Sequence, residues 1–151
     1  LLTEVPRLAG TDGRKMGKSF GNAVFLKDPP AVIREKIATM VTDTRRKRCS
    51  DPGEPNDCPA FTLHRAFVSK AKQEELARGC RSAGIGCLDC KKILLENLCR
   101  ELLPIQEKRK RLLADPDGIY RVLREGRDRA EKIARQTMVD VYEKIGINKY
   151  H

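Results

Sequence analysis

Two lysines in this sequence, Lys15 and Lys18, have a spacing that suits phosphate chemistry. They lie in a glycine-rich stretch that runs from Gly10 to Gly21. Two ammonium groups on a flexible loop can bind a triphosphate and stabilise the charge that develops on a leaving pyrophosphate. The P-loop pattern G-x-x-x-x-G-K-[ST] does not fit, because Asp12 occupies the position of its first glycine. A basic surface loop without a ligand is the alternative.

A second chemical feature is the number of cysteines, six in 151 residues. Cys87 and Cys90 form a C-x-x-C pair, Cys80 lies six intervening residues before the pair, and Cys58 lies a further 21 back. In a reducing compartment such cysteines are more typical of metal ligands than of disulfides. Four thiolates suit a structural zinc ion or a [4Fe-4S] cluster, and the spacing alone does not choose between them.

The remaining thiols and one histidine are expected to lie outside the metal centre. Cys49 follows a run of basic residues and is the rival to Cys58 as a ligand. Cys99 lies beside Leu98 in a leucine-rich stretch, which favours a small buried side chain. His64 is expected to be a surface or packing residue, with a metal ligand or an RNA contact as the alternatives.

The charge of the chain favours a polyanionic partner. Lys and Arg number 31 against 21 Asp and Glu, which gives a formal net charge of +10. Hydrophobic residues make up 40%, so the chain differs from core-poor disordered sequences. Its apolar runs are too short for a transmembrane helix, and Glu4, Pro6 and Arg7 interrupt any signal peptide. We therefore expect a cytoplasmic protein without a membrane partner.

Helix-start signals and apolar periodicity predict a mainly α-helical fold. A strand is expected to end near Val5, and Asp28 before two prolines is expected to cap a helix that ends near Val41. Loops are expected over 42–59 and 79–90, with two short helices between them. Two long helices, over 91–114 and 115–146, are expected to close the chain, the first bent at Pro104.

The stretch from Pro6 to Asn22 reads PRLAGTDGRKMGKSFGN. It resembles the KMSKS loop of class I aminoacyl-tRNA synthetases, with flanks similar to those of the bacterial tryptophanyl type. Segments at 41–44, 103–106 and 123–126 resemble the helical anticodon-binding region of that family. The resemblance implies that residues 1–27 are the last strand and loop of a Rossmann catalytic domain, otherwise absent, and that 28–151 form the anticodon-binding domain. The His-x-Gly-His type motif is absent, because the only histidines are His64 and His151.

The same resemblance implies a function for the intact protein. It would activate tryptophan with ATP and Mg²⁺, charge tRNA(Trp) and act as a homodimer, and this chain alone would be inactive. Lys15 and Lys18 would be catalytic, and Gly17 stands where serine is usual. The ATP-binding residues would be Lys15, Met16, Gly17, Lys18 and Ser19.

Some members of this family carry a [4Fe-4S] cluster in a segment that resembles 79–92. The resemblance therefore favours this cluster over zinc, in a cysteine segment over 49–90, with Cys58, Cys80, Cys87 and Cys90 as ligands. Basic residues flank these cysteines, and RNA readers usually engage unstacked loop bases such as those of an anticodon. The expected tRNA contacts are Arg45, Arg46, Lys47, Arg48, Lys91 and Lys92. The alternatives are a non-catalytic RNA-binding module with a structural zinc or iron–sulfur site, and a redox or iron-sensing module.

Overall fold

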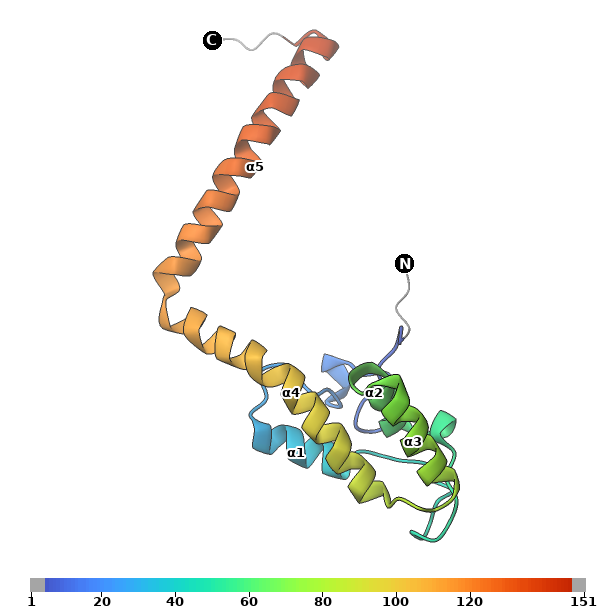
Figure 1. The fold of residues 1–151 in the computed structure, drawn as a ribbon. Helices are drawn as coiled ribbons and strands as arrows, with labels where there is room; N and C mark the ends of the chain where they lie inside the picture. The colour runs from blue at the N-terminus through green and yellow to red at the C-terminus, as the bar shows by residue number, and fades with distance from the viewer. Residues whose placement is uncertain (1–4, 148–151) are drawn as a thin grey trace. The chain divides into compact units, whose positions relative to one another are not determined.

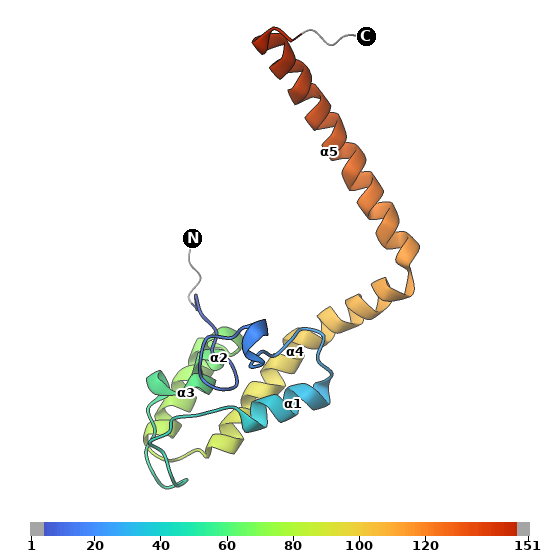
Figure 2. The same cartoon turned by 180° about the vertical axis from the view of Figure 1, so that it is seen from behind.

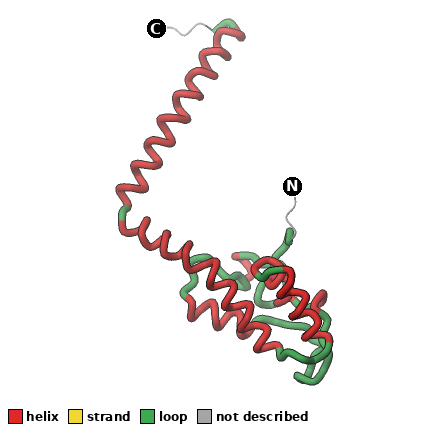
Figure 3. The backbone as a smooth tube through the Cα atoms, viewed as in Figure 1, coloured by secondary structure: helices red, strands yellow, loops and turns green. Residues whose placement is uncertain are grey.

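A computed structural model describes residues 5–147, which are mainly α-helical (Figure 1). The prediction of a mainly helical chain is confirmed. The described residues contain no strand (Figure 3), only an isolated antiparallel bridge between Ala9 and Lys15. The expected strand over 1–5 lies outside the described residues except for Val5, which lies in a bend. The elements are η1 (Lys18–Phe20), α1 (Pro30–Thr39), η2 (Pro55–Asp57), α2 (Pro59–Phe67), α3 (Lys70–Arg81), α4 (Cys87–Ala114) and α5 (Pro116–Ile145).

The chain forms two compact units, residues 1–106 and residues 107–151. The phosphate-loop candidate and the cysteines of interest all belong to the first unit. The domain boundary expected between residues 27 and 28 falls inside this unit, where Leu8, Met16 and Val24 pack against the helical core.

A single apolar cluster joins α1, α2 and the first half of α4. Ile33 and Ile37 lie one turn apart on α1, and Leu94, Leu98 and Leu102 lie one turn apart on α4. Each of these five side chains is at most 5% exposed. Figure 2 shows α1 running alongside α4. Burial of such side chains contributes about 1.5–3 kcal/mol each, so this contact fixes the position of α4 in the unit.

Asp28 does not cap α1 as the sequence predicts. The N-cap residue is Pro29, which has no side chain that can accept a hydrogen bond. The carboxylate of Asp28 instead accepts from the backbone N–H of Phe25 at 2.9 Å and from Nζ of Lys36 at 2.7 Å. Asp28 therefore closes the turn before α1 and ties it to the middle of that helix.

The loop predicted over 79–90 is much shorter in the structure. Helix α3 continues to Arg81 and α4 begins at Cys87, so only residues 82–86 form the connection. Gly79, which favours a loop in the sequence, lies inside α3, and its carbonyl accepts from Gly84 N–H at 2.8 Å. Ala83, with φ of 56°, takes the left-handed position that glycine usually fills after a helix. The C-x-x-C pair therefore lies on a helix rather than in a loop.

The second half of α4 and α5 carry their apolar residues on the surface. Helix α4 continues through Pro104, with Ile105 and Leu112 at 47% and 50% exposed. No described residue of α5 is buried, and Ile133 is 70% exposed. Within the second unit the predicted stripe of α5 is therefore present but has no apolar partner. None of the described helices combines the length and the apolar character needed to cross a lipid bilayer.

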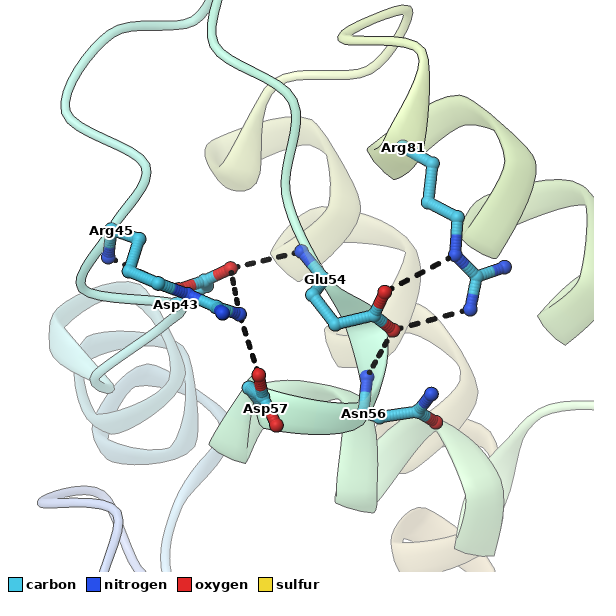
Figure 4. Close-up of polar contacts among 6 residues, drawn as sticks. All are labelled: Asp43, Arg45, Glu54, Asn56, Asp57 and Arg81. Atoms are coloured by element: carbon cyan, nitrogen blue, oxygen red, sulfur yellow. Dashed lines mark hydrogen bonds and ion pairs between the residues drawn. The ribbon is translucent and has the colours of Figure 1, made fainter.

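A carboxylate network holds the segment between α1 and α2 (Figure 4). Asp43 is 6% exposed and accepts from Arg45 Nε at 3.1 Å and from Glu54 N–H at 2.9 Å. These bonds, the Arg45 side chain first, lower the pKa of Asp43 to about 2. Glu54 in turn accepts from Asn56 N–H at 3.0 Å and pairs with Arg81, on α3, at 3.2 Å. The network therefore ties this segment to the end of α3.

Replacement of Asp43 tests this network through its pH dependence. The pKa of Asp43 is about 2 in the folded chain and about 3.8 without partners, so its stabilisation is complete above about pH 4 and is lost as the pH falls to 2. We expect Asp43→Asn to lower the free energy of unfolding at pH 6 by about 1–2 kcal/mol, a value reduced by solvent screening at Arg45. Thermal unfolding at pH 6 and pH 2.5 measures this difference.

The stability of the Asp43→Asn variant should approach that of the unmodified chain at pH 2.5. Asp57→Asn, which removes only the exposed partner of Arg45, is the matched control and should change stability by less. An Asp43→Asn deficit that is the same at both pH values would contradict the assigned role of the carboxylate.

Candidate functional site

Lys15 and Lys18 lie on a compact loop whose backbone is held from both sides. Met16 N–H donates to the Leu8 carbonyl at 3.0 Å, and Gly10 N–H donates to the Arg14 carbonyl at 2.7 Å. Both lysine side chains are exposed, and within residues 5–147 neither ammonium group forms an ion pair or hydrogen bond. The loop therefore presents two free cations, as a phosphate site requires.

Asn22 fastens this loop and was not singled out from the sequence. It is 3% exposed, and its Nδ2 donates to Asp12 Oδ1 at 2.7 Å and to the Lys15 carbonyl at 3.1 Å. Its Oδ1 accepts from Gly17 N–H at 2.9 Å. The backbone of Gly10 packs so closely against the Asn22 side chain that a Cβ at that position would collide with it. Asn22 is the last residue of the motif stretch, and no local pattern marks its role.

Asp12, whose negative charge would oppose phosphate binding in a P-loop, is paired with partners inside the loop. It accepts from Asn22, and the Arg14 guanidinium Nε lies 2.7 Å from its Oδ2. The hydrogen bond from Asn22, ahead of those from Arg14, lowers the pKa of this carboxyl. Asp12 therefore serves the internal structure of the loop and does not compete with a phosphate for Lys15 or Lys18.

The four predicted metal ligands come together in the structure. Cys58, Cys80, Cys87 and Cys90 line one cavity of about 20 Å³, together with apolar atoms of Ala60, Phe61 and Ile85. Cys58 precedes α2, Cys80 lies in the last turn of α3, and Cys87 and Cys90 share one face of the first turn of α4. Cys49 is exposed and Cys99 is half-buried, and neither lines this cavity.

Burial and neighbouring cations set the electrostatics of the cysteine cavity. Burial raises the pKa of the Cys90 thiol to about 12 and raises that of Cys80, so both are neutral thiols at pH 7 unless a metal binds. Arg46 Nη1 lies 3.9 Å from Cys87 Sγ. Lys91 is 9% exposed and lines the same cavity, and burial lowers its pKa. The cavity thus combines four cysteine sulfurs with two cations that favour negative charge on them.

His64 lies against this cavity. Its side chain is fully buried, and Nε2 lies 3.2 Å from Cys90 Sγ. Burial lowers the pKa of His64 to about 4, so the ring is neutral at pH 7. Of the surface or packing role expected from the sequence, the structure shows packing, but His64 and Cys90 lie 26 positions apart in the sequence and no local pattern indicates their contact.

The donor set fits a four-thiolate metal centre in type and number, and the four cysteines line one cavity. Zn²⁺ bound by four thiolates at about 2.3 Å brings the sulfurs to about 3.8 Å from one another, whereas each thiolate of a [4Fe-4S] cluster binds a different iron. Within the part of the chain that the structure describes, no group of three or more Cys, His, Asp or Glu side chains is placed to hold a metal ion. Either centre therefore requires the thiols to move from these positions.

The basic residues expected to contact tRNA fall into three groups: ion-paired residues, residues that face the cysteine cavity, and exposed residues without an ion pair. Arg45 and Lys92 form ion pairs at the surface, with Asp43 and Asp57 and with Asp89 respectively. Arg46 and Lys91 face the cysteine cavity, where Lys91 Nζ also donates to the Ala38 carbonyl at 2.7 Å.

Lys47 and Arg48 have exposed side chains that form no ion pair with any residue in 5–147. Together with Lys92 they line an open pocket of about 350 Å³ beside Cys87. Lys47 and Arg48 therefore present exposed positive charge without a paired carboxylate beside Cys87.

Comparisons with known proteins define the class to which this arrangement belongs. Residues 2–103 match the family model of tRNA synthetases class I (W and Y), so the chain belongs to that family. The match includes the lysine loop and all four cavity cysteines.

The relatives narrow this class. The chain is 40% identical over 147 residues to the tryptophan–tRNA ligase of Ralstonia nicotianae, and 43% identical over 142 residues to that of Thermotoga maritima. These alignments cover 97% and 93% of the chain but 37% and 43% of the relatives, so the chain spans less than half their length.

A solved structure agrees with these sequences. Tryptophanyl-tRNA synthetase from Campylobacter jejuni, crystallised with ADP and tryptophan, has a TM-score of 0.81 and 31% identity to this chain. That comparison covers 93% of the chain and 43% of the synthetase.

Replacement of Asn22 tests its hold on the lysine loop. Asn22→Ala removes three hydrogen bonds and leaves the Gly17 N–H without its acceptor, so we expect a loss of about 1–3 kcal/mol in the free energy of unfolding. Hydrogen exchange of the Gly17 amide should become faster, as measured by mass spectrometry of the loop peptide. Ser19→Ala, at an exposed position of the same loop, is the control. Unchanged exchange in the Asn22 variant would show that other contacts hold the loop.

Proposed function

We propose that this chain is part of a tryptophan–tRNA ligase, which joins tryptophan to tRNA(Trp) at the expense of ATP. The family match over 2–103, which spans the lysine loop, carries this proposal. Tryptophan is preferred to tyrosine as the substrate because the tryptophan–tRNA ligases of Ralstonia nicotianae and Thermotoga maritima are 40% and 43% identical to the chain. The intact protein acts in the cytoplasm as a homodimer in this proposal.

The loop residues Lys15 to Ser19 bind the ATP phosphates in this proposal. In the reaction the tryptophan carboxylate attacks the α-phosphorus, and the bond from that phosphorus to pyrophosphate breaks. Lys15 and Lys18 stabilise the negative charge that moves onto pyrophosphate, alongside Mg²⁺ bound to ATP. Their exposed, unpaired ammonium groups support this role, and Asn22 limits the reorganisation that the loop needs. The remainder of the intact protein supplies the tryptophan pocket.

Residues 28–151 contribute the anticodon contact. The accessible cations at 47–48 lie on the segment that leads to Cys58, and the ion-paired Arg45 and Lys92 lie close by. A phosphate can exchange for the exposed carboxylates Asp57 and Asp89 at little cost, whereas the buried Asp43 stays paired with Arg45. Arg46 and Lys91 act on the cysteine centre in preference to RNA, because they face its cavity.

A [4Fe-4S] cluster held by Cys58, Cys80, Cys87 and Cys90 completes the proposal. These four thiols line one cavity, and they come from the start of α2, the end of α3 and the start of α4. A bound cluster supplies a covalent cross-link between these three helices. The chain's own contribution is to hold the sulfurs on short helical turns and to surround them with Arg46, Lys91 and apolar side chains that limit the access of water.

Loss of either lysine tests the catalytic proposal in the intact protein. We expect Lys15→Ala and Lys18→Ala each to slow tryptophan-dependent exchange of pyrophosphate into ATP by about 100- to 1,000-fold, because each removes one stabilising charge from the transition state. Lys27→Ala, at an exposed position nearby, is the control and should retain the exchange rate.

Aminoacylation of tRNA(Trp) by the same intact protein tests the identity of the substrates. Charging with tyrosine in place of tryptophan would refute the proposed substrate. Binding of tRNA without activation of any amino acid would favour the non-catalytic RNA-binding module.

The metal content of anaerobically purified protein tests the cluster. We expect the purified protein to contain iron and sulfide and to show a broad absorption band at about 400 nm. Gly53→Ala should reduce the iron content several-fold, because a Cβ at this buried position would lie 2.7 Å from Cys80 Sγ and displace the thiol. Gly126→Ala, in open space on α5, is the control. Stoichiometric zinc without this absorption band would refute the cluster and show a structural zinc site instead.

A further inference from the structure

We propose that His64 is a positioning residue for the cysteine centre, with Nε2–H donating a hydrogen bond to the Cys90 sulfur when that sulfur is a metal-bound thiolate. The inference rests on the proposed metal centre. It assigns a function to a fully buried polar side chain that the activity proposed above leaves unused.

The Cys90 sulfur is the one polar partner that the described residues offer to the His64 ring. Nε2 lies 3.2 Å from Cys90 Sγ, and no other described residue provides a partner for either ring nitrogen. The ring packs against Phe61 one turn earlier on α2, with the ring centroids 5.6 Å apart. His64 and Cys90 lie on α2 and α4, so their contact also joins two of the helices that carry the ligands.

The position of the ring proton follows from the unpaired nitrogen. Nδ1 is buried without a partner in the described structure. A proton on Nδ1 would leave a buried N–H donor without an acceptor, whereas a proton on Nε2 gives that donor the sulfur of Cys90. The tautomer with the proton on Nε2 is therefore favoured, and Cys90 is the acceptor.

An acceptor role for Cys90 matches a metal-bound sulfur better than a free thiol. A neutral thiol is a weak acceptor, whereas hydrogen bonds to an ionised acceptor are shorter and roughly twice as strong. The contact is therefore strongest when Cys90 is a thiolate ligand. It orients the sulfur and withdraws electron density from it, which raises the reduction potential of a bound cluster.

Two variants of the full chain separate hydrogen bonding from packing. His64→Leu fills much of the space but has no donor, and His64→Gln keeps an N–H at the end of a side chain of similar reach. After anaerobic loading with iron and sulfide, we expect His64→Leu to lower the reduction potential and to release iron to a chelator about 10- to 100-fold faster. His64→Gln should restore most of both properties. Far-ultraviolet circular dichroism monitors the fold.

The unmodified chain offers a test that does not depend on a folded variant. In the reduced, cluster-loaded protein labelled with ¹⁵N-histidine, pulsed electron paramagnetic resonance should detect coupling of the cluster spin to a ring nitrogen of His64. The coupling should be absent in His64→Gln, which retains only His151 as a labelled residue. Absence of the coupling in the unmodified protein would overturn the proposed contact.

The outcomes distinguish the two proposals. An unmodified chain that binds no metal under these conditions overturns the metal centre and the role of His64 together. If the unmodified chain binds the cluster, and His64→Leu has the same reduction potential and the same rate of iron release as the unmodified chain, the role of His64 alone is overturned. Equal losses in His64→Leu and His64→Gln also overturn it, since packing of the ring would then account for the effect.

Discussion

The leucine stripe of α4 is the constraint on which the cysteine site depends. Leu94, at 0% exposed, packs with Leu98 against α1 and α2 and fixes the rotation of α4 about its axis. Cys90 and Cys87 precede Leu94 by four and seven residues, which places both on the buried face of the same helix. The apolar contact that stabilises the unit therefore also directs these two sulfurs toward Cys58 and Cys80. One helical periodicity therefore serves core packing and the placement of the two cysteines that are proposed to bind the metal.

The lysine loop is attached to the same helices by polar contacts. Lys36 on α1 donates to the Ala23 carbonyl at 2.8 Å, directly after Asn22. Gln106 on α4 donates to the carbonyls of Leu26 and Asp28 at 3.0 and 2.9 Å. The segment that follows the loop is thus held at both of its ends by the first unit. Because Asn22 restrains the loop at its base, Lys15 and Lys18 extend from a fixed support while their side chains stay free.

Patterns within one segment could be predicted from the sequence, and contacts between segments could not. The helices followed from apolar spacing, whereas the set of four cysteines that share a cavity followed from the family resemblance, because spacing alone left Cys49 as a rival to Cys58. The end of α3 was missed because Gly79, which favours a loop, lies inside the helix, and because Ala83, not a glycine, adopts the left-handed turn after it. Asn22 and the contact of His64 with Cys90 depend on partners brought close only by folding, so no local pattern marks them.

Part of the net charge of +10 belongs to two cations, Arg46 and Lys91, that face the cysteine cavity. Lys91 is 9% exposed with a single carbonyl acceptor, and Arg46 has a buried Nε without a partner. Such groups are costly in this cavity, because burial without a counter-charge disfavours an ammonium or a guanidinium. Four thiolates around Zn²⁺ leave two negative charges, and a cluster bound by four thiolates is negative in the same way. In the proposed centre these two cations would be its counter-charges, so this part of the basic excess would serve the fold, and the exposed cations at 47–48 would remain for the proposed RNA contact.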